Sequence, residues 1–165
     1  MERIYDPAAV AAWLRRGKLE DCFDTRGLAF HLCRFHKGEE LTGPDAPLGA
    51  LLFVVQGTVR VYGVRSDGRM VPVNQQHSPV VLGDLEFVHG DKTPFFVEAR
   101  TAVTCLCLPI APHRERLASD VRFLQMLLRA YADKLQYFAF VDATAATLEE
   151  RLLRYLDTVA AGKTL

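Results

Sequence analysis

Residues 51–108 constrain the fold more than any other part of the chain, because short apolar runs alternate there with corners marked by glycine and polar residues. Strands of four to eight residues at roughly ten-residue spacing, with turn residues between them, are typical of an antiparallel sandwich or barrel. The Asp67-Gly68 pair is the strongest hairpin signal, since glycine adopts positive φ at little steric cost. The predicted strands occupy 51–55, 58–64, 70–73, 80–85, 95–99 and 102–108, with a polar corner at 74–79.

Composition narrows the class of protein further. The 165 residues are 50% hydrophobic and 24% charged with zero formal net charge, which is typical of a globular chain that buries one core. No run approaches the length of about 18 apolar residues that a membrane span needs, and the first six residues are too polar for a signal peptide. We therefore expect a cytoplasmic protein without a membrane partner.

Helix signals flank the strand region on both sides. Asp6 is placed as an N-cap, Pro7 as a first-turn residue and Gly17 as a stop, which predicts a helix between them. A strand entering the sheet is expected over 28–35. After the strands, a short helix is predicted over 112–118, and Ser119-Asp120 can cap a longer helix that follows.

The long helix carries an apolar seam. Its apolar residues recur at alternating three- and four-residue spacing, close to three heptads of a coiled-coil seam. Met126, Leu127 and Phe140 supply a second apolar face, so the helix is expected to contact both the sheet and a copy of itself. The alternative is a helix that is buried only within its own monomer. The residues predicted to form a symmetric homodimer are Val121, Leu124, Leu128, Tyr131, Leu135 and Phe138.

The seam ends at Asp142, where the apolar pattern shifts. Thr147 and Glu150 have the spacing of a capping box, which would start a new helix. We therefore expect a hinge over 142–147.

Several motifs, taken in order, resemble the cyclic-nucleotide-binding β-roll, and most of all that of Crp/Fnr-type bacterial transcription regulators. The resemblance covers about residues 28–156, and the segment 150–156 is similar to the one that leads from the dimer helix into the DNA-binding domain. The motifs are FHKGE at 35–39, GTVRVY at 57–62, SDGR at 66–69, LGDL at 82–85 and VEA at 97–99.

This resemblance implies a mainly β fold with flanking helices, namely a double-stranded β-helix (β-roll or jelly roll) followed by a long C-terminal dimerisation helix. It implies a sensor domain over 1–118 and a dimerisation helix with hinge over 119–165. The implied function is effector sensing and dimerisation without catalysis. DNA binding would need a C-terminal helix-turn-helix, for which there is no room before Leu165. The 8 basic and 7 acidic residues over 114–165 give no electrostatic footprint for DNA.

In that family a turn after a Gly-Glu-Leu motif holds the cyclic phosphate through backbone N–H groups and an arginine, and the glutamate binds the ribose. Here aspartate replaces the glutamate, a glutamate follows where a small residue is usual, and threonine stands at the arginine position. Lys92 is the only cation near that position, and a lysine gives a point charge instead of the planar bidentate fork with which arginine binds phosphate. The candidate effector-binding residues are Gly83, Asp84, Leu85, Glu86, Lys92 and Thr93.

These departures argue against cyclic AMP and leave several alternatives. A cyclic nucleotide could be held by Asp84 and Lys92, another small effector could bind, or the pocket could be collapsed. Some family members bind haem through a histidine near this turn, and His89 is the histidine in reach. No cofactor is predicted, and the effector is left unidentified.

The cysteines fit a reduced compartment. Cys105 and Cys107 point to one face of a strand, and their spacing is not that of a CxxC zinc pair. Two interpretations stay open for them, buried apolar side chains or a redox pair. The other two cysteines are Cys22 and Cys33. Relatives with an iron–sulfur cluster carry clustered N-terminal cysteines, and no such cluster occurs here.

Two other function classes compete with the regulator. A cupin-like metalloenzyme needs paired histidines at i and i+2 with a carboxylate, whereas the histidines here are scattered at 31, 36, 77, 89 and 113. His31 and His36 are five apart and are expected on opposite strand faces. No catalytic residues and no metal site are therefore predicted. A free-standing regulatory module is the other alternative.

Overall fold

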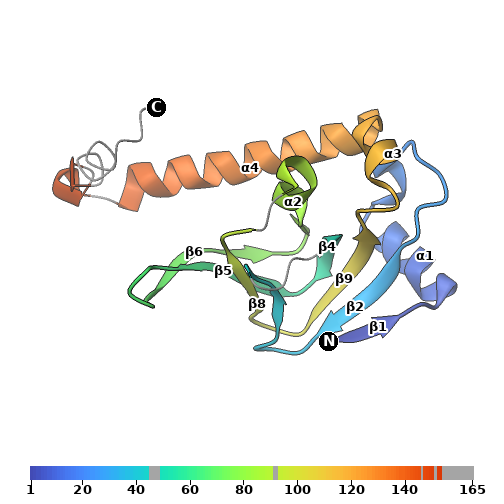
Figure 1. Cartoon of the computed structure of the whole chain (residues 1–165), viewed down its shortest axis with the longest axis horizontal. Coiled ribbons are helices and arrows are strands. Elements are labelled where there is room, and N and C mark those ends of the chain that lie inside the picture. The colour runs from blue at the N-terminus through green and yellow to red at the C-terminus, as the bar shows by residue number, and fades with distance from the viewer. Residues whose placement is uncertain (45–48, 91–92, 146, 151, 154–165) are drawn as a thin grey trace. The chain divides into compact units, whose positions relative to one another are not determined.

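A computed structural model describes residues 1–44, 49–90, 93–145, 147–150 and 152–153 (Figure 1). The chain divides into two compact units, Met1–Leu127 and Leu128–Leu165, which are described separately. The predicted boundary between 118 and 119 stays a prediction.

The first unit is built from two antiparallel sheets. One sheet has the order β1 (Glu2–Ile4), β2 (His31–Phe35), β9 (Val103–Pro109), β4 (Ala50–Gln56) and β7 (Val80–Leu82). The other has the order β3 (Glu40–Thr42), β8 (Phe96–Ala99), β5 (Thr58–Val64) and β6 (Met70–His77). The predicted antiparallel β-roll is confirmed, and β1 adds an edge strand that the sequence did not indicate.

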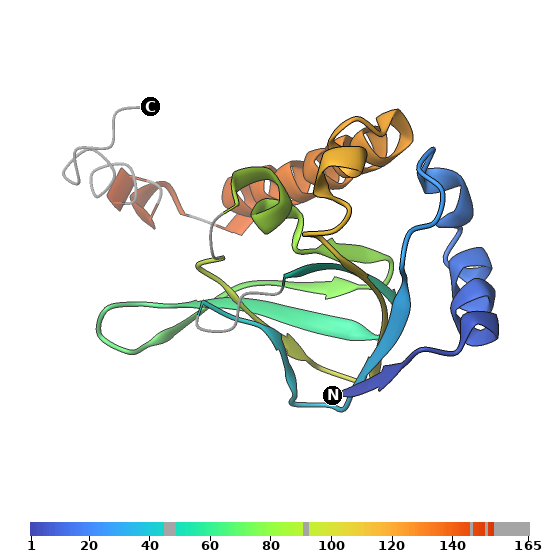
Figure 2. The ribbon, with the colours of Figure 1, turned by 45° about the vertical axis from the view of Figure 1, so that its right-hand side comes forward.

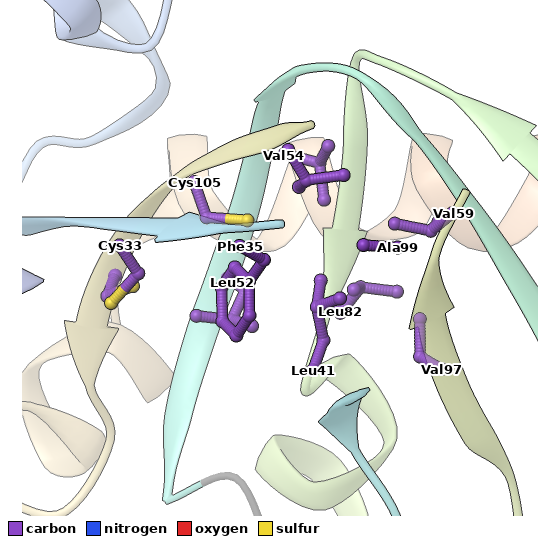
Figure 3. Packing of buried hydrophobic residues seen from close by; sticks show 12 residues of the cluster. Cys33, Phe35, Leu41, Leu52, Val54, Val59, Leu82, Val97, Ala99 and Cys105 are labelled. Atoms are coloured by element: carbon purple, nitrogen blue, oxygen red, sulfur yellow. The ribbon is translucent and has the colours of Figure 1, made fainter. Parts of the chain in front are cut away.

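A shared apolar core lies between the inner faces of these sheets (Figure 3). Alternate residues of each strand point inward, as the period of two requires. Large aliphatic side chains each stabilise the fold by roughly 1.5–3 kcal/mol when fully buried. The core residues are Cys33, Phe35, Leu52, Val54, Leu82, Val103, Cys105 and Cys107 from one sheet, and Leu41, Val59, Val97 and Ala99 from the other.

Four α-helices flank the sheets in the described residues: α1 (Pro7–Arg16), α2 (Asp84–His89), α3 (Arg114–Ala118) and α4 (Val121–Ala145), with a short 3-10 helix at Glu20–Cys22. α1 has the predicted caps, since Asp6 accepts a hydrogen bond from the Ala8 N–H at 2.9 Å and Gly17 ends the helix. It packs on β2 and β9, and Figure 2 shows it beside β2. Among the described residues, no helix is both long and apolar enough to cross a membrane.

The hairpin between β5 and β6 forms where it was predicted. Gly68 has a φ of 81°, and its N–H donates to the Arg65 carbonyl at 2.9 Å. The polar corner predicted over 74–79 is wrong, because β6 runs to His77 and pairs Asn74 with Val61 and Gln76 with Val59. The polar side chains at the end of β6 are of types that favour turns, although the backbone there is extended.

The strand predicted over 80–85 is also wrong in its second half. β7 ends at Leu82, and Gly83 then adopts a left-handed conformation with φ 82°. This change of direction starts α2, so the turn expected from the family resemblance is a short helix here. The sequence did not reveal α2, because a short apolar run is compatible with either a strand or a helix.

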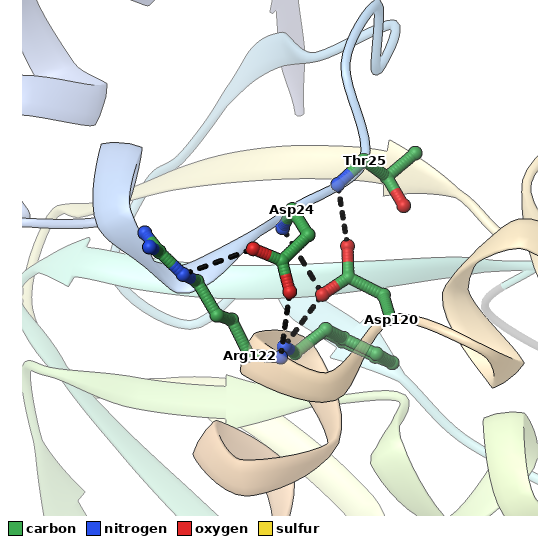
Figure 4. A network of polar contacts seen from close by, with 5 residues as sticks. Asp24, Thr25, Asp120 and Arg122 are labelled. Carbon is green, nitrogen blue, oxygen red and sulfur yellow. Dashed lines mark hydrogen bonds and ion pairs between the residues drawn. The ribbon is translucent and has the colours of Figure 1, made fainter.

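Asp120 fixes the start of α4, as the sequence predicted (Figure 4). Its carboxylate accepts hydrogen bonds from the backbone N–H groups of Phe123 at 2.9 Å, Asp24 at 3.1 Å and Thr25 at 2.7 Å. The first contact caps the helix, and the others tie it to the segment before β2. An exposed ion pair between Arg122 and Asp24, at 2.9 Å, lies beside this network.

α4 continues through Asp142, where the predicted seam ends, to Ala145. The predicted capping box is confirmed in the second unit. The Thr147 N–H donates to Glu150 Oε2 at 2.9 Å, and the Glu150 N–H donates to Thr147 Oγ1 at 3.2 Å. The hinge itself stays a prediction, and residues 151 and 154–156 of the segment that resembles the family linker lie outside the described residues.

Replacing the Asp120 carboxylate should cost much of the stability of the first unit. Asp120→Ala is expected to lower the free energy of unfolding by about 2–4 kcal/mol, because three backbone N–H groups lose a charged acceptor. Urea denaturation followed by circular dichroism measures the loss. Arg122→Ala is the control and should cost at most about 1 kcal/mol, since it breaks an exposed ion pair. Equal losses in the two variants would contradict the role assigned to Asp120.

The same carboxylate should make stability depend on pH. Burial alone would raise the pKa of Asp120, but the hydrogen bonds from Phe123, Thr25 and Asp24 together hold it below its ordinary value. A depressed pKa stabilises the fold above the unfolded-state pKa of about 3.9 and the contribution is lost as the pH falls through the folded value. The difference in unfolding free energy between the parent and Asp120→Asn should therefore shrink below about pH 4. A difference that stays constant down to pH 2 would rule this out.

Candidate functional site

The predicted effector residues gather around α2. Gly83 lies at the N-cap of the helix, and Asp84, Leu85 and Glu86 form its first turn. Both carboxylate residues are buried, Asp84 with 4% and Glu86 with 8% of its surface exposed. The first turn of α2 therefore carries two buried carboxyl side chains, both of which make contacts within the protein.

Thr93 has a structural contact of its own. It is buried, and its Oγ1 accepts a hydrogen bond from the Phe95 N–H at 3.2 Å. This bond closes a local turn ahead of β8, so the hydroxyl is engaged with the backbone. Lys92, the remaining predicted site residue, lies outside the described residues.

α2 is held from the C-terminal side of the first unit. The Arg114 guanidinium at the start of α3 donates hydrogen bonds to the Glu86 and Phe87 carbonyls, and its Cζ lies 5.3 Å from the centroid of the Phe87 ring. The Phe87 ring meets the Phe123 ring of α4 edge to face, with centroids 5.1 Å apart. A displacement of α2 would therefore act directly on the first turn of α4.

Two amide side chains on the inner face of β6 carry buried oxygens without a hydrogen bond among the described residues, Asn74 Oδ1 and Gln76 Oε1. Their strand partners Val61 and Val59 contribute to the core, so the amides face the interior of the roll. A buried polar atom without a partner costs roughly 1–3 kcal/mol. These oxygens are functional candidates that the sequence reading missed, because it assigned them to a turn.

The seam of α4 is exposed along most of its length. Val121 is 59%, Leu128 69% and Leu135 71% exposed. Leu124 and Phe138 are also exposed, whereas Tyr131 is half-buried. On the first turns of the same helix, Phe123 and Leu127 are fully buried. Leu127 is therefore buried, as predicted for the second apolar face, whereas Phe140 of that face is exposed. The sequence analysis did not identify Phe123 as a buried residue, because it lies outside the seam.

The histidines do not form the pair that a cupin metal site needs among the described residues. His89 is exposed, which leaves it free of the buried contacts a haem ligand would have. His113 Nε2 accepts a hydrogen bond from the Ala29 N–H at 3.3 Å, and His77 Nδ1 lies 2.9 Å from Thr58 Oγ1. His31 belongs to a separate group with two cysteines, considered below.

Comparison with known proteins agrees with this geometry. The family model described as cyclic nucleotide-binding domain matches residues 32–120. Regulatory protein YeiL of Escherichia coli O157:H7 is 30% identical over 114 residues, which is 66% of this chain and 50% of that protein. The chain thus spans half the length of this relative.

Solved structures show the same fold. The sensor domain of the transcriptional regulator DNR from Pseudomonas aeruginosa matches with a TM-score of 0.61 at 12% identity, covering 78% of this chain and 92% of that one. FixK2 from Bradyrhizobium japonicum matches with a TM-score of 0.59 at 24% identity, covering 84% of this chain and 69% of that one. The resemblance to Crp/Fnr-type regulators is therefore confirmed, and the chain belongs to the cyclic nucleotide-binding domain family.

Proposed function

We propose that this chain is the effector-sensing and dimerisation region of a Crp/Fnr-type transcription regulator. The observation that carries the proposal is the exposed apolar seam on α4, on a helix whose first turns are also buried in the sensor unit. The similarity to a regulatory protein supports it. In this proposal the protein works in the cytoplasm, and DNA contact belongs to a further C-terminal domain.

The seam favours a second copy of the chain as its partner. Exposed leucines at successive turns are costly in water, and burying each would contribute roughly 1.5–3 kcal/mol before the costs of association. A two-fold axis along the helix brings the same seam against itself, as a symmetric interface requires. Polar residues lie outside the seam, with Gln125 at an e position that flanks a coiled-coil core and Gln136 at a b position on the outer face.

The site around α2 favours an effector other than a cyclic nucleotide. Asp84 and Glu86 are buried carboxyl residues that already make contacts within the protein, so neither side chain offers a cyclic phosphate a positive charge. The Thr93 hydroxyl accepts a backbone hydrogen bond and offers no charge to the phosphate. Regulators of this family that bind cyclic nucleotides use an arginine at that position, and this chain does not.

The buried amides of β6 support a different ligand chemistry. Asn74 Oδ1 and Gln76 Oε1 lie inside the roll without donors among the described residues, so a small molecule bearing N–H or O–H groups would satisfy them. Such a ligand would remove the cost of two unpaired acceptors on binding. The contact from Phe87 to Phe123 then supplies a route from the roll to α4.

The dimer can be tested by placing charge in the seam. Leu128→Glu with Leu135→Glu should abolish dimerisation, because two unpaired carboxylates would be buried in an apolar interface. Sedimentation at tens of micromolar should show the parent at twice 18.5 kDa and the double variant at 18.5 kDa.

Gln125→Glu with Gln136→Glu is the matched control, since it adds the same charge to the same helix outside the seam. This control should remain dimeric. The dimer proposal would be contradicted if the parent sedimented as a monomer, or if the control dissociated as readily as the seam variant.

The effector proposal predicts that the parent does not bind cyclic AMP at physiological concentrations. Glu86→Ala with Thr93→Arg should move the site towards binding, because one carboxylate is removed and a bidentate cation is supplied. Isothermal titration calorimetry measures both proteins, and thermal unfolding checks that the variant is folded. Glu86→Ala with Thr93→Gln keeps the bulk without the charge and should not gain. Micromolar or tighter binding by the parent would overturn the proposal.

We predict that removing the Asn74 side-chain amide, whose oxygen is buried without a hydrogen-bond partner among the described residues, stabilises the fold. Asn74→Leu should raise the free energy of unfolding by about 1 kcal/mol, since a buried acceptor without a partner is replaced by an apolar side chain of similar size. Gln75→Leu, on the exposed face of the same strand, should change it by less than about 0.5 kcal/mol. Chemical denaturation compares the two. A loss of stability in Asn74→Leu would mean that the amide has a structural partner.

A further inference from the structure

A compact group of metal-ligating side chains lies on the β2–β9 pair, outside both α2 and the seam. His31 lies opposite Cys107 and Cys33 opposite Cys105, so these four side chains share the inner face of the sheet. The ligand atoms of His31, Cys33 and Cys107 all lie within 4.8 Å of one another. In the part of the chain that the structure describes, no other three cysteine, histidine or carboxylate side chains come so close. Figure 3 shows Cys33 and Cys105 at the end of the core where this group lies.

The two thiols of the group are in direct contact. The Cys107 thiol is hydrogen-bonded to Cys33, and this contact lowers the pKa of Cys33, assisted by the positive charges of Arg3 and the N-terminus against the opposing effect of burial. The same hydrogen bond, together with burial, raises the pKa of Cys107. A cation that displaced the proton between these two sulfurs would bind both of them.

His31 lies at the open edge of the group. Desolvation, followed by the nearby positive charge of Arg3, lowers the pKa of His31. It stacks on Tyr5 with centroids 5.1 Å apart, which holds its orientation, and its nitrogens have no hydrogen bond among the described residues. His31 is half-buried and Tyr5 is exposed, so an ion can enter from this edge. Apolar packing of Cys33 and Cys107 alone would not require the His31 ring beside them.

We propose that His31, Cys33 and Cys107 bind one Cu(I) ion through two thiolate sulfurs and one imidazole nitrogen. Soft thiolates select Cu(I) and Zn(II) among the available metals. Structural Zn(II) sites use four protein ligands, and Zn(II) sites with three protein ligands keep an open fourth position for water, whereas both sulfurs of this three-ligand group are buried. Three-coordinate binding by soft donors suits the monovalent d10 ion.

The charges balance in this assignment. Binding replaces the protons of both thiols, which pass to solvent, and the oxidation state of copper does not change. Two thiolates, a neutral imidazole and Cu(I) carry a net charge of −1, which the positive charge of Arg3 opposes. A buried site therefore avoids an uncompensated charge.

The experiment titrates the reduced full chain with Cu(I) under anaerobic conditions against a chromophoric Cu(I) chelator. One ion should bind per chain, with release of up to two protons, and X-ray absorption on the copper should show two sulfur neighbours and one nitrogen. Cys33→Ala and Cys107→Ala should each weaken binding by more than about 100-fold, since loss of even an outer-shell partner costs about 10–100-fold. His31→Gln should weaken it by about 10-fold or more, and this half-exposed position tolerates the change.

Cys105→Ala is the matched control, because it removes an equally buried thiol from the same face of β9 and leaves the group intact. It should bind Cu(I) as the parent does, and thermal unfolding of each variant checks folding. Absence of binding, an undiminished affinity in Cys33→Ala and Cys107→Ala, or an equal loss in Cys105→Ala would overturn the site. Binding of Zn(II) with no binding of Cu(I) would overturn the choice of ion.

Discussion

The structure depends on how the first turn of α4 is fixed to the sensor unit. Asp120 holds three backbone N–H groups, one of them within the helix and two in the segment before β2. Directly after it, Phe123 is fully buried and stacks on Phe23 while meeting Phe87 of α2 edge to face. A carboxylate and an aromatic ring thus fix both the direction and the rotation of the helix, and that rotation decides which side chains remain exposed.

The consequences of that rotation could be predicted only in part. The heptad spacing identified the seam, and the spacing of glycines and apolar runs identified the antiparallel roll, because both follow from side-chain periodicity. Asp120 and the Thr147–Glu150 capping box were also foreseen, since their contacts are local. Phe123 was not, because its partners Phe23 and Phe87 are distant in sequence.

The errors have a common physical origin. The extended backbone of β6 carries Asn74 and Gln76, residues that favour turns, and only pairing with β5 reveals the strand. The apolar run around Leu82 was interrupted by Gly83 in a left-handed conformation, which changed a strand into a helix. The proximity of Cys33 to Cys107 likewise arises from the pairing of β2 with β9, and the spacing of the cysteines along the sequence does not indicate it.

One helix therefore serves two surfaces that have different requirements. Phe123 and Leu127 are buried in the interior of the first unit, whereas Val121, Leu124 and Leu128 are exposed and belong to the seam that we propose for the second copy. Because these residues alternate over little more than two turns, a rotation that improved one set would expose the other. In the regulator that we propose, a signal that moves Phe87 against Phe123 would alter how the seam is presented, without direct contact between an effector and the second copy.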